Sequence, residues 1–596
     1  MQEFHLYNHR QLVDCAMGRT PADIVLRNGK WVCVQSGEIL PGMDIAICGQ
    51  RIAFVGQDAG HTIGENTIVI DAGERYMVPG LLDGHMHVES GMLTVTEFVS
   101  TIIPRGTTGI FIDPHEIGNV FGLEGVRLMA DDAAVQPIHV FVQVPSCVPS
   151  SPGLETPGAT MGPDEVSEAL TWPGVIGLGE VMNFTGVVNG DEKMHKEIEA
   201  TKRAGKVVGG HYASPDLGNS FHAYVAGGAE DDHEGTTVED AIARVRQGIR
   251  VMIREGSAWR DLAVMIRAIT ELGLDSRNFI LCTDDSHSHT LYNEGHMDRV
   301  VRTAISHGLT PMKAVQMATI NTAEHFGLSR EIGMIAPGRY ADILLVNDLV
   351  EMDMDLVIAK GQVVSRNGQL EVALPEITYP DWAINSVNLK RPLEIKDFRL
   401  VSYSDNNSTT AHVIGVIEDQ APTRHLRMDL MVQNGEVTAD ITKDIAKIGI
   451  IERHHGSGNI NVGLVHGFGF DTPCAIASTV AHDCHHMIVV GTDDENMVIA
   501  ANLLAECGGG QIVVRNGEII GKVELPIAGL MANEPAPIVA KKVATVLEGF
   551  KACGSNLHNP NMQLSLLGLV VIPQLRISDL GLVDVEKFKF IQVLEP

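Results

Sequence analysis

Eight short apolar runs, separated by stretches with helical spacing, constrain the fold of this chain more than any other feature. We expect each run to form a β-strand, because it is short, apolar and followed by a turn or a helical stretch. The predicted strands are residues 76–83, 107–112, 138–144, 175–180, 207–211, 229–233, 249–254 and 278–284. Helical spacing is clearest at residues 191–204 and 257–272. Eight β/α units over about 250 residues predict a (β/α)8 barrel, whose active site lies at the carboxyl ends of its strands.

Two further groups of strands flank this central region. Near the N-terminus, residues 24–26 precede the turn-forming pair Asn28-Gly29, and a second hairpin turns at Gly49-Gln50. A similar pattern returns after the central region, with an apolar run at 341–346 and a turn at Lys360-Gly361. These groups predict one small composite β-sandwich that is built from both flanking segments.

The pattern changes again after Pro375, where strand-like residues 511–514 and a helical stretch at 537–547 predict a mixed arrangement. A length of 596 residues fits several domains. The predicted domains are the composite β-sandwich at 1–75 with 333–374, the α/β barrel at 76–332 and a C-terminal α+β domain at 375–596.

The acidic composition limits the classes of partner. A formal net charge of −31 argues against a nucleic-acid backbone or an anionic membrane surface, since both require basic patches. The N-terminus lacks a signal-peptide pattern, and no apolar run reaches the roughly 18 residues of a membrane-spanning helix. The nine cysteines form no CxxC pair. We therefore expect a cytoplasmic protein, and its exposed hairpins and 44% hydrophobic content predict a homo-oligomer.

Metal-binding residue types occur at the carboxyl ends of five of the predicted strands. A His-x-His pair at a strand end sends both imidazoles to one side, because strand side chains alternate. One catalytic ion usually takes three protein ligands, so six ligands indicate two ions bridged by a carboxylate. In chain order the candidate ligands are His85, His87, Glu180, His211, His233 and Asp284.

Imidazole and carboxylate ligands without thiolate are compatible with Zn²⁺, Mn²⁺ and Fe²⁺. Cys282 points to the same side as Asp284 but lies about 6.6 Å deeper in the barrel, so we exclude it from the ligand set. With 25 histidines in the chain, chance placement is the alternative to a metal site. It would require separate coincidences at five strand ends.

Five strings of residues, four at the ends of predicted barrel strands and one in the C-terminal domain, are long enough to be specific. They lie at residues 111–116, 177–183, 210–214, 282–285 and 481–486. These strings resemble the bacterial adenine deaminase family of the amidohydrolase superfamily, and the resemblance covers nearly the whole chain. Many amidohydrolases place a carboxylated lysine at the fourth barrel strand. This chain has Glu180 there, as adenine deaminases do, which disfavours a dihydroorotase-like enzyme.

The resemblance implies hydrolytic deamination of adenine, a purine base, to hypoxanthine and ammonia. It also implies two divalent metal ions, with Mn²⁺ or Fe²⁺ favoured and Zn²⁺ possible. One ion would bind His85, His87 and Asp284, the other His211 and His233, with Glu180 between them. Asp284 would take a proton from the nucleophile and pass it on. Glu234 is either a second acid/base group or a salt-bridged carboxylate of the barrel rim.

Two further segments carry polar residues without a settled role. Asp113, His115 and Glu116 follow the second predicted strand, where they either contact the edge of the purine or cap the next helix. The segment 482–486 either folds over the barrel mouth, holds an additional ion or forms a polar turn. We expect His454-His455 to be part of a surface loop.

Two other functions stay open at this point. The first is an amidohydrolase that acts on a cyclic amide or on another aminated heterocycle. Glu180 and residues 113–116 disfavour this function. The second is a metal-binding scaffold without catalytic activity, which a complete ligand set with a separate acid/base candidate disfavours.

Overall fold

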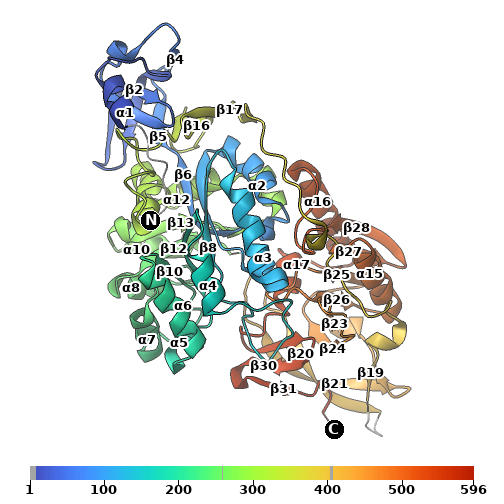
Figure 1. Ribbon diagram of the computed structural model, residues 1–596. Helices are drawn as coiled ribbons and strands as arrows, with labels where there is room; N and C mark the ends of the chain where they lie inside the picture. The colour runs from blue at the N-terminus through green and yellow to red at the C-terminus, as the bar shows by residue number, and fades with distance from the viewer. Residues whose placement is uncertain (1–8, 258, 403–406, 596) are drawn as a thin grey trace.

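The computed structural model describes residues 9–257, 259–402 and 407–595. Parallel strands with helices between them form its central part, blue through green to yellow-green in Figure 1. One sheet has the order β10-β9-β8-β7-β6-β14 and a second the order β11-β12-β13. Because β14 follows β13 directly and pairs with β6, the parallel strands curl around a common axis. The strands are β6 (Leu81–His87), β7 (Thr107–Ile112), β8 (His139–Val144), β9 (Val175–Val181), β10 (Val207–Gly210), β11 (Asp231–Asp232), β12 (Arg250–Arg254), β13 (Phe279–Cys282) and β14 (Asp284–Asp285).

Helices α2 to α10 lie between successive strands of this curled sheet, and α11 to α14 follow its last strand. They are α2 (Val95–Ile102), α3 (His115–Ala134), α4 (Pro163–Ala169), α5 (Phe184–Asn189), α6 (Glu192–Arg203), α7 (Asn219–Gly227), α8 (Val238–Arg246), α9 (Leu262–Met265), α10 (Arg267–Thr270), α11 (Ser288–Asn293), α12 (Met297–Ser306), α13 (Pro311–Met317) and α14 (Ile320–His325). The helix predicted at 191–204 is confirmed as α6. The helical stretch predicted at 257–272 is confirmed in part: Arg260 pairs with Glu255 in a bridge, and the two short helices α9 and α10 follow.

The first predicted strand, 76–83, is wrong in its bounds. It is divided into β5 (Tyr76–Pro79), which joins a different sheet, and β6. Gly80 lies at the division, where a Cβ would come within 2.0 Å of Thr108 Oγ1, so a larger residue could not pass β7 so closely. His85 and His87 are consequently inside β6 and not after it. The strand predicted at 229–233 is only the two-residue β11.

Strands that precede the curled sheet in the sequence and strands that follow it join one nine-stranded sheet in the described part of the chain. The turns predicted at Gly49-Gln50 and Lys360-Gly361 are confirmed. The Asn28-Gly29 hairpin is wrong: both residues lie inside β1, where a register shift marks a bulge that accommodates the φ of 60° at Asn28. The order is β18-β17-β16-β15-β5-β1-β2-β3, with β4 on β1, and the remaining bounds are β1 (Ile24–Cys33), β2 (Glu38–Cys48), β3 (Arg51–Gly56), β4 (Ile68–Asp71), β15 (Ile343–Val346), β16 (Met354–Ala359), β17 (Gln362–Arg366) and β18 (Gln369–Leu370).

The C-terminal region holds a ten-stranded sheet, β19-β22-β21-β20-β24-β23-β26-β25-β27-β28, and a small sheet, β29-β30-β31. The strand predicted at 511–514 is confirmed as β27, and the helix predicted at 537–547 as α16. The bounds are β19 (Leu400–Val401), β20 (Ser408–Gly415), β21 (Arg424–Gln433), β22 (Glu436–Val437), β23 (Ile445–Ile451), β24 (Ile460–His466), β25 (Cys474–Ser478), β26 (Met487–Gly491), β27 (Gly510–Arg515), β28 (Glu518–Glu524), β29 (Leu575–Ser578), β30 (Gly581–Asp584), β31 (Lys589–Ile591), α15 (Asp494–Glu506), α16 (Ala536–Ala552) and α17 (Pro560–Leu566), and the N-terminal helix is α1 (His9–Ala16).

The C-terminal region, orange to red in Figure 1, packs against the central part beside α2 and α3. Hydrogen bonds fasten the two together. Thr156 donates from its backbone N and from Oγ1 to the carboxylate of Asp579, at 3.0 and 2.6 Å. The backbone N of Ala536, at the start of α16, donates to Glu97 Oε2 at 2.8 Å. These contacts hold the C-terminal region over the carboxyl ends of the parallel strands.

A separate apolar cluster fills the inside of the curled sheet. The rings of Phe111 and Phe326 stack at its centre with a centroid distance of 3.9 Å. Cys282 belongs to this cluster, which agrees with its exclusion from the ligand set. Seven strands contribute to this cluster, and besides Cys282 their side chains in it are Leu82, Phe111, Phe141, Ile176, Val207, Met252 and Ile280. Within the residues described, no helix is both long and apolar enough to cross a membrane.

This packing predicts the effect of removing an inward ring. Phe111→Ala should lower the free energy of unfolding by about 3–5 kcal/mol, because it leaves a cavity between two stacked neighbours. Denaturant titration followed by circular dichroism would measure the change. Val135→Ala, at a side chain that is 51% exposed, is the control and should change stability by less than about 0.5 kcal/mol. Equal effects of the two substitutions would contradict the packing described.

Candidate metal centre and substrate cavity

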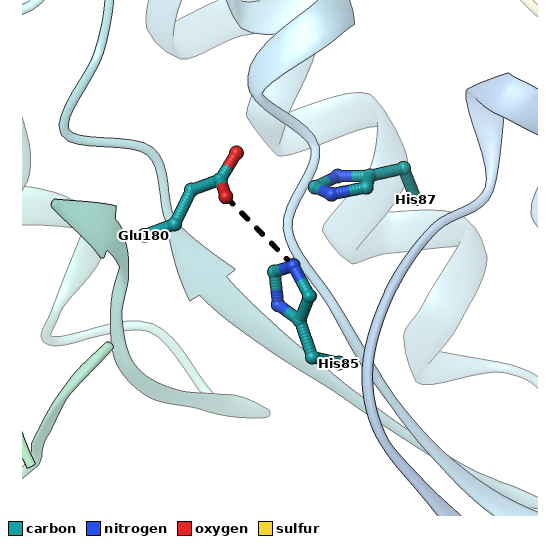
Figure 2. Close-up of side chains that lie close together, drawn as sticks. All are labelled: His85, His87 and Glu180. Atoms are coloured by element: carbon teal, nitrogen blue, oxygen red, sulfur yellow. Dashed lines mark ion pairs between the residues drawn. The ribbon is translucent and has the colours of Figure 1, made fainter. Parts of the chain in front are cut away.

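The six residues predicted as metal ligands converge at the carboxyl end of the curled sheet. Glu180 is the hub of the cluster. Its Oε2 lies 2.6 Å from His211 Nδ1, 3.0 Å from His233 Nε2 and 3.9 Å from His85 Nε2. Figure 2 shows His85 and Glu180 pointing toward each other from different strands. All four side chains are buried or nearly so.

His87 and Asp284 form the other side of the cluster. His87 Nδ1 donates to the backbone carbonyl of Asp113 at 2.9 Å, which leaves Nε2 with its lone pair free. This Nε2 lies 3.4 Å from Asp284 Oδ1. Metal-binding histidines typically donate their second ring N–H to a carbonyl or carboxylate in this way. The tautomer that the backbone imposes on His87 is therefore the one a metal ion requires.

The donor set fits divalent cations. His85 Nε2 is buried and has no hydrogen-bond partner among the residues that the structure describes. His85, His87 and Glu180 bring three ligand atoms within 4.8 Å of one another, and Glu180, His211 and His233 do the same. Glu180 is common to both groups. Burial alone would raise the pKa of Glu180, but the imidazoles of His211 and His233 hold it well below its ordinary value. A bridging ligand must be such an anion.

A cavity of about 790 Å³ lies over this cluster. His87, Glu180, His211, His233 and Asp284 line it from the curled sheet. The C-terminal region forms the opposite wall through apolar residues of α17 and the following loop, and through His482 and Asp483. The segment 482–486 thus contributes two residues, His482 and Asp483, to the wall of the cavity at the carboxyl end of the curled sheet. The volume is within the range typical of small-molecule sites, about 300–1,000 Å³.

Comparison with known proteins assigns the family. Residues 76–364 match the amidohydrolase family, and residues 420–589 match the adenine deaminase C-terminal domain. The chain is 57% identical to adenine deaminase 3 of Rhizobium meliloti (strain 1021) over 98% of both chains. The chain belongs to the adenine deaminase family. It is also 58% identical to an adenine deaminase of Ruegeria pomeroyi, over 98% of this chain and 97% of that one, and 47% identical to one of Moorella thermoacetica, over 98% of each. The resemblance seen in the five strings is thereby confirmed.

In this member of the adenine deaminase family, Arg254 is a site residue that the sequence reasoning missed. Its Nη1 donates to Glu234 Oε1 and, at 3.1 Å, to Asp284 Oδ2, while its Nε donates to Asp261 Oδ2 at 3.0 Å. Burial alone would raise the pKa of Glu234, but the Arg254 guanidinium holds it below its ordinary value. Arg254 is the last residue of the predicted strand 249–254, so its position at a strand end could have indicated it.

The residues 113–116 lie at the same rim, in two layers. Asp113 Oδ2 accepts from the backbone N of Glu180 at 2.8 Å, and burial together with the Glu180 carboxylate raises the pKa of Asp113 to about 7. His115 lines the cavity, with Nδ1 3.3 Å from Glu180 Oε1, and burial lowers its pKa to about 3. Glu116 accepts from Ser90 Oγ at 3.0 Å. Asp113 and Glu116 are thus placed behind the cavity wall, where they hold its residues.

The cluster predicts which histidines hold metal. His85→Ala and His211→Ala should each lower the metal content of purified protein from about two equivalents, because each removes a ligand from one of the two groups. Elemental analysis would measure the content. His222→Ala, which removes an exposed imidazole of α7, is the control and should leave the content unchanged. Full metal content in both cluster variants would contradict the assignment.

Proposed function

We propose that this protein hydrolyses adenine to hypoxanthine and ammonia at a binuclear metal centre. The observation that carries the proposal is the Glu180-centred cluster on the floor of a cavity, in a chain of the adenine deaminase family. A carboxylate facing several imidazoles beside two acidic side chains is suited to hydrolysis assisted by metal ions.

The ligands divide between two ions as the resemblance implies. His85, His87 and Asp284 would hold one ion and His211 and His233 the other, with Glu180 available to both. Support comes from the single oxygen, Glu180 Oε2, that faces imidazoles of both groups. Mn²⁺ or Fe²⁺ is favoured, and Zn²⁺ is compatible with the same donors. The bound ions would supply Lewis acidity that lowers the pKa of a water molecule at the cluster.

The carboxylates of Asp284 and Glu234 accept and donate the protons of the reaction. Arg254 donates to both Asp284 and Glu234, which keeps them ionised and able to accept a proton. Asp284 takes one proton from the water that attacks C6 and passes it to ring nitrogen N1. The second water proton goes to the amino group as the C6–N bond breaks and ammonia leaves. Glu234, on the other side of the same guanidinium, is the second group able to carry these protons.

Purine contact falls to His115, the member of residues 113–116 that lines the cavity. Asp113 positions Glu180 by accepting a hydrogen bond from its backbone N, and it positions His87 by accepting one from its ring Nδ1. Glu116 is held by Ser90 behind the wall. We therefore assign Asp113 and Glu116, which the sequence predicted to contact substrate directly, to positioning.

The architecture that presents this site is part of the proposal. We infer that the curled parallel strands close as a (β/α)8 barrel, to which β14 and β6 contribute the closing pair. The nine-stranded sheet corresponds to the composite β-sandwich of the flanking segments. Residues 375–596 form the C-terminal α+β domain that covers the barrel mouth.

Ammonia release tests substrate, chemistry and metal together. Protein stripped of metal and reconstituted separately with Mn²⁺, Fe²⁺ or Zn²⁺ should release ammonia from adenine in at least one form, and chelation should abolish the release. A cyclic amide measured in parallel should not be opened. Opening of the cyclic amide by a metal form that leaves adenine intact would overturn the proposal. Full metal content without turnover on either would favour a binding scaffold.

The proton-carrying role of Glu234 predicts a change in turnover. Glu234→Gln keeps the shape of the side chain but cannot accept a proton, so kcat for adenine should fall by about 10²–10⁴-fold. KM should change much less. Glu199→Gln, at a surface carboxylate of α6 that is 58% exposed, is the matched control and should leave kcat unchanged. A kcat for Glu234→Gln within a few fold of wild type would refute this role.

A further inference from the structure

Asp483 is a buried carboxyl group that the proposed chemistry does not use. It belongs to the C-terminal region, is 1% exposed and lines the cavity opposite the metal cluster. Its Oδ2 is buried and has no hydrogen-bond partner in the described residues. A buried polar atom without a partner is costly, so it indicates a group that such a cavity would bind.

The surroundings of Asp483 favour its neutral form. Burial raises the pKa of this carboxyl well above its ordinary value, the nearby Glu155 carboxylate adds to the rise, and His211 and Ser150 only partly oppose it. The side chain of Ser150 is a hydrogen-bonding neighbour of this carboxyl. Its ion-pair neighbours among the described residues are His115, with Nε2 at 3.9 Å, and His482, with Nδ1 at 3.7 Å. Both distances exceed a hydrogen bond. A carboxyl in this setting offers one O–H donor and one C=O acceptor side by side.

The position of Asp483 relative to Glu180 determines which edge of a base it can meet. His115 stands between them, with Nδ1 3.3 Å from Glu180 Oε1 and Nε2 3.9 Å from Asp483 Oδ1. Glu180 and Asp483 both line the cavity, so a base that presents C6 to the Glu180 cluster and extends across the cavity to Asp483 meets this carboxyl with its opposite edge. In adenine that edge carries N3, an acceptor, and N9–H, a donor.

We propose that Asp483 binds the N3–N9 edge of the purine as a carboxylic acid, donating to N3 and accepting from N9–H. This inference rests on the proposed function, since it takes C6 to be the reacting atom. The two hydrogen bonds close a ring that only a base with a free N9–H can form. Asp483 would therefore make the site specific for the free base and reject purines substituted at N9.

Substitutions at Asp483 distinguish a carboxylic acid, which both donates and accepts a hydrogen bond, from a carboxylate, which only accepts. Asn at this position also has a donor and an acceptor side by side, so Asp483→Asn should keep kcat/KM for adenine within about 3-fold of wild type. Asp483→Ala has neither group. Its kcat/KM should fall by about 10²-fold, chiefly through KM, because two buried hydrogen bonds are lost.

Base analogues give the second readout. Wild type should prefer adenine over 9-methyladenine and over 3-deazaadenine by about 10-fold or more each, while 7-deazaadenine, which keeps N3 and N9–H, should bind as adenine does. Asp483→Ala should lose the first two preferences. The matched control is Asp132→Asn, at a buried carboxyl with a raised pKa that binds Thr96 and Tyr379 away from the cavity. It should leave all the ratios unchanged.

The outcomes separate this inference from the proposed function. Equilibrium binding of adenine and 9-methyladenine, measured by calorimetry, reports on Asp483 even if wild type releases no ammonia. The absence of ammonia release would contradict only the proposed function. An Asp483→Asn variant as impaired as Asp483→Ala would overturn the carboxylic acid. Wild-type protein that accepts 9-methyladenine or 3-deazaadenine as readily as adenine would overturn the inference whether or not the variants fold.

Discussion

The burial of the Glu180 carboxylate is the constraint on which the rest of the site depends. An ionised carboxylate can be buried only if positive charge or hydrogen-bond donors surround it. Here the imidazoles of His211 and His233 approach one oxygen within 3.0 Å, and the side chain of Asp113 fixes the backbone at Glu180 itself. Three different strands must end at the same depth for this to happen. The curled sheet provides that arrangement.

The acidic residues around this hub are kept distinct by their neighbours. Arg254 places one guanidinium between Glu234 and Asp284, which lets two carboxylates stay ionised in a buried site. Asp113 and Asp483 have no such cation among the described residues, and burial raises the pKa of each. Side chains of one chemical type thus take different roles, as proton acceptors, as a backbone anchor and as a neutral hydrogen-bonding group.

The C-terminal region completes the cavity that the curled sheet leaves open. Buried guanidinium groups hold its cavity-facing segments in place by donating to backbone carbonyls. Arg576 donates to the carbonyls of Leu566 and Ala421, which both line the cavity, and Arg453 donates to the carbonyl of His485, within the segment 482–486. The wall that faces the substrate is therefore fixed by interactions within the C-terminal region, independently of the metal cluster.

The sequence by itself determined the parallel α/β arrangement and the positions of the metal-binding residue types, because strand length, apolar runs and the alternation of side chains are local properties. It could not locate Gly80 as the point where one strand leaves its sheet, nor show that Asn28-Gly29 lies in a bulge. Both depend on partners distant in the chain, Thr108 and β2.

Tertiary structure alone decided which polar residues share the site. Arg254 joins Glu234 to Asp284, and Asp483 reaches the cavity from a segment about 200 residues further along the chain. No spacing in the sequence reports such an approach. His-x-His at a strand end indicates a metal, because two residues suffice to orient the imidazoles. What the metal acts on depends on the wall opposite, which only the packing of the C-terminal region against the sheet creates.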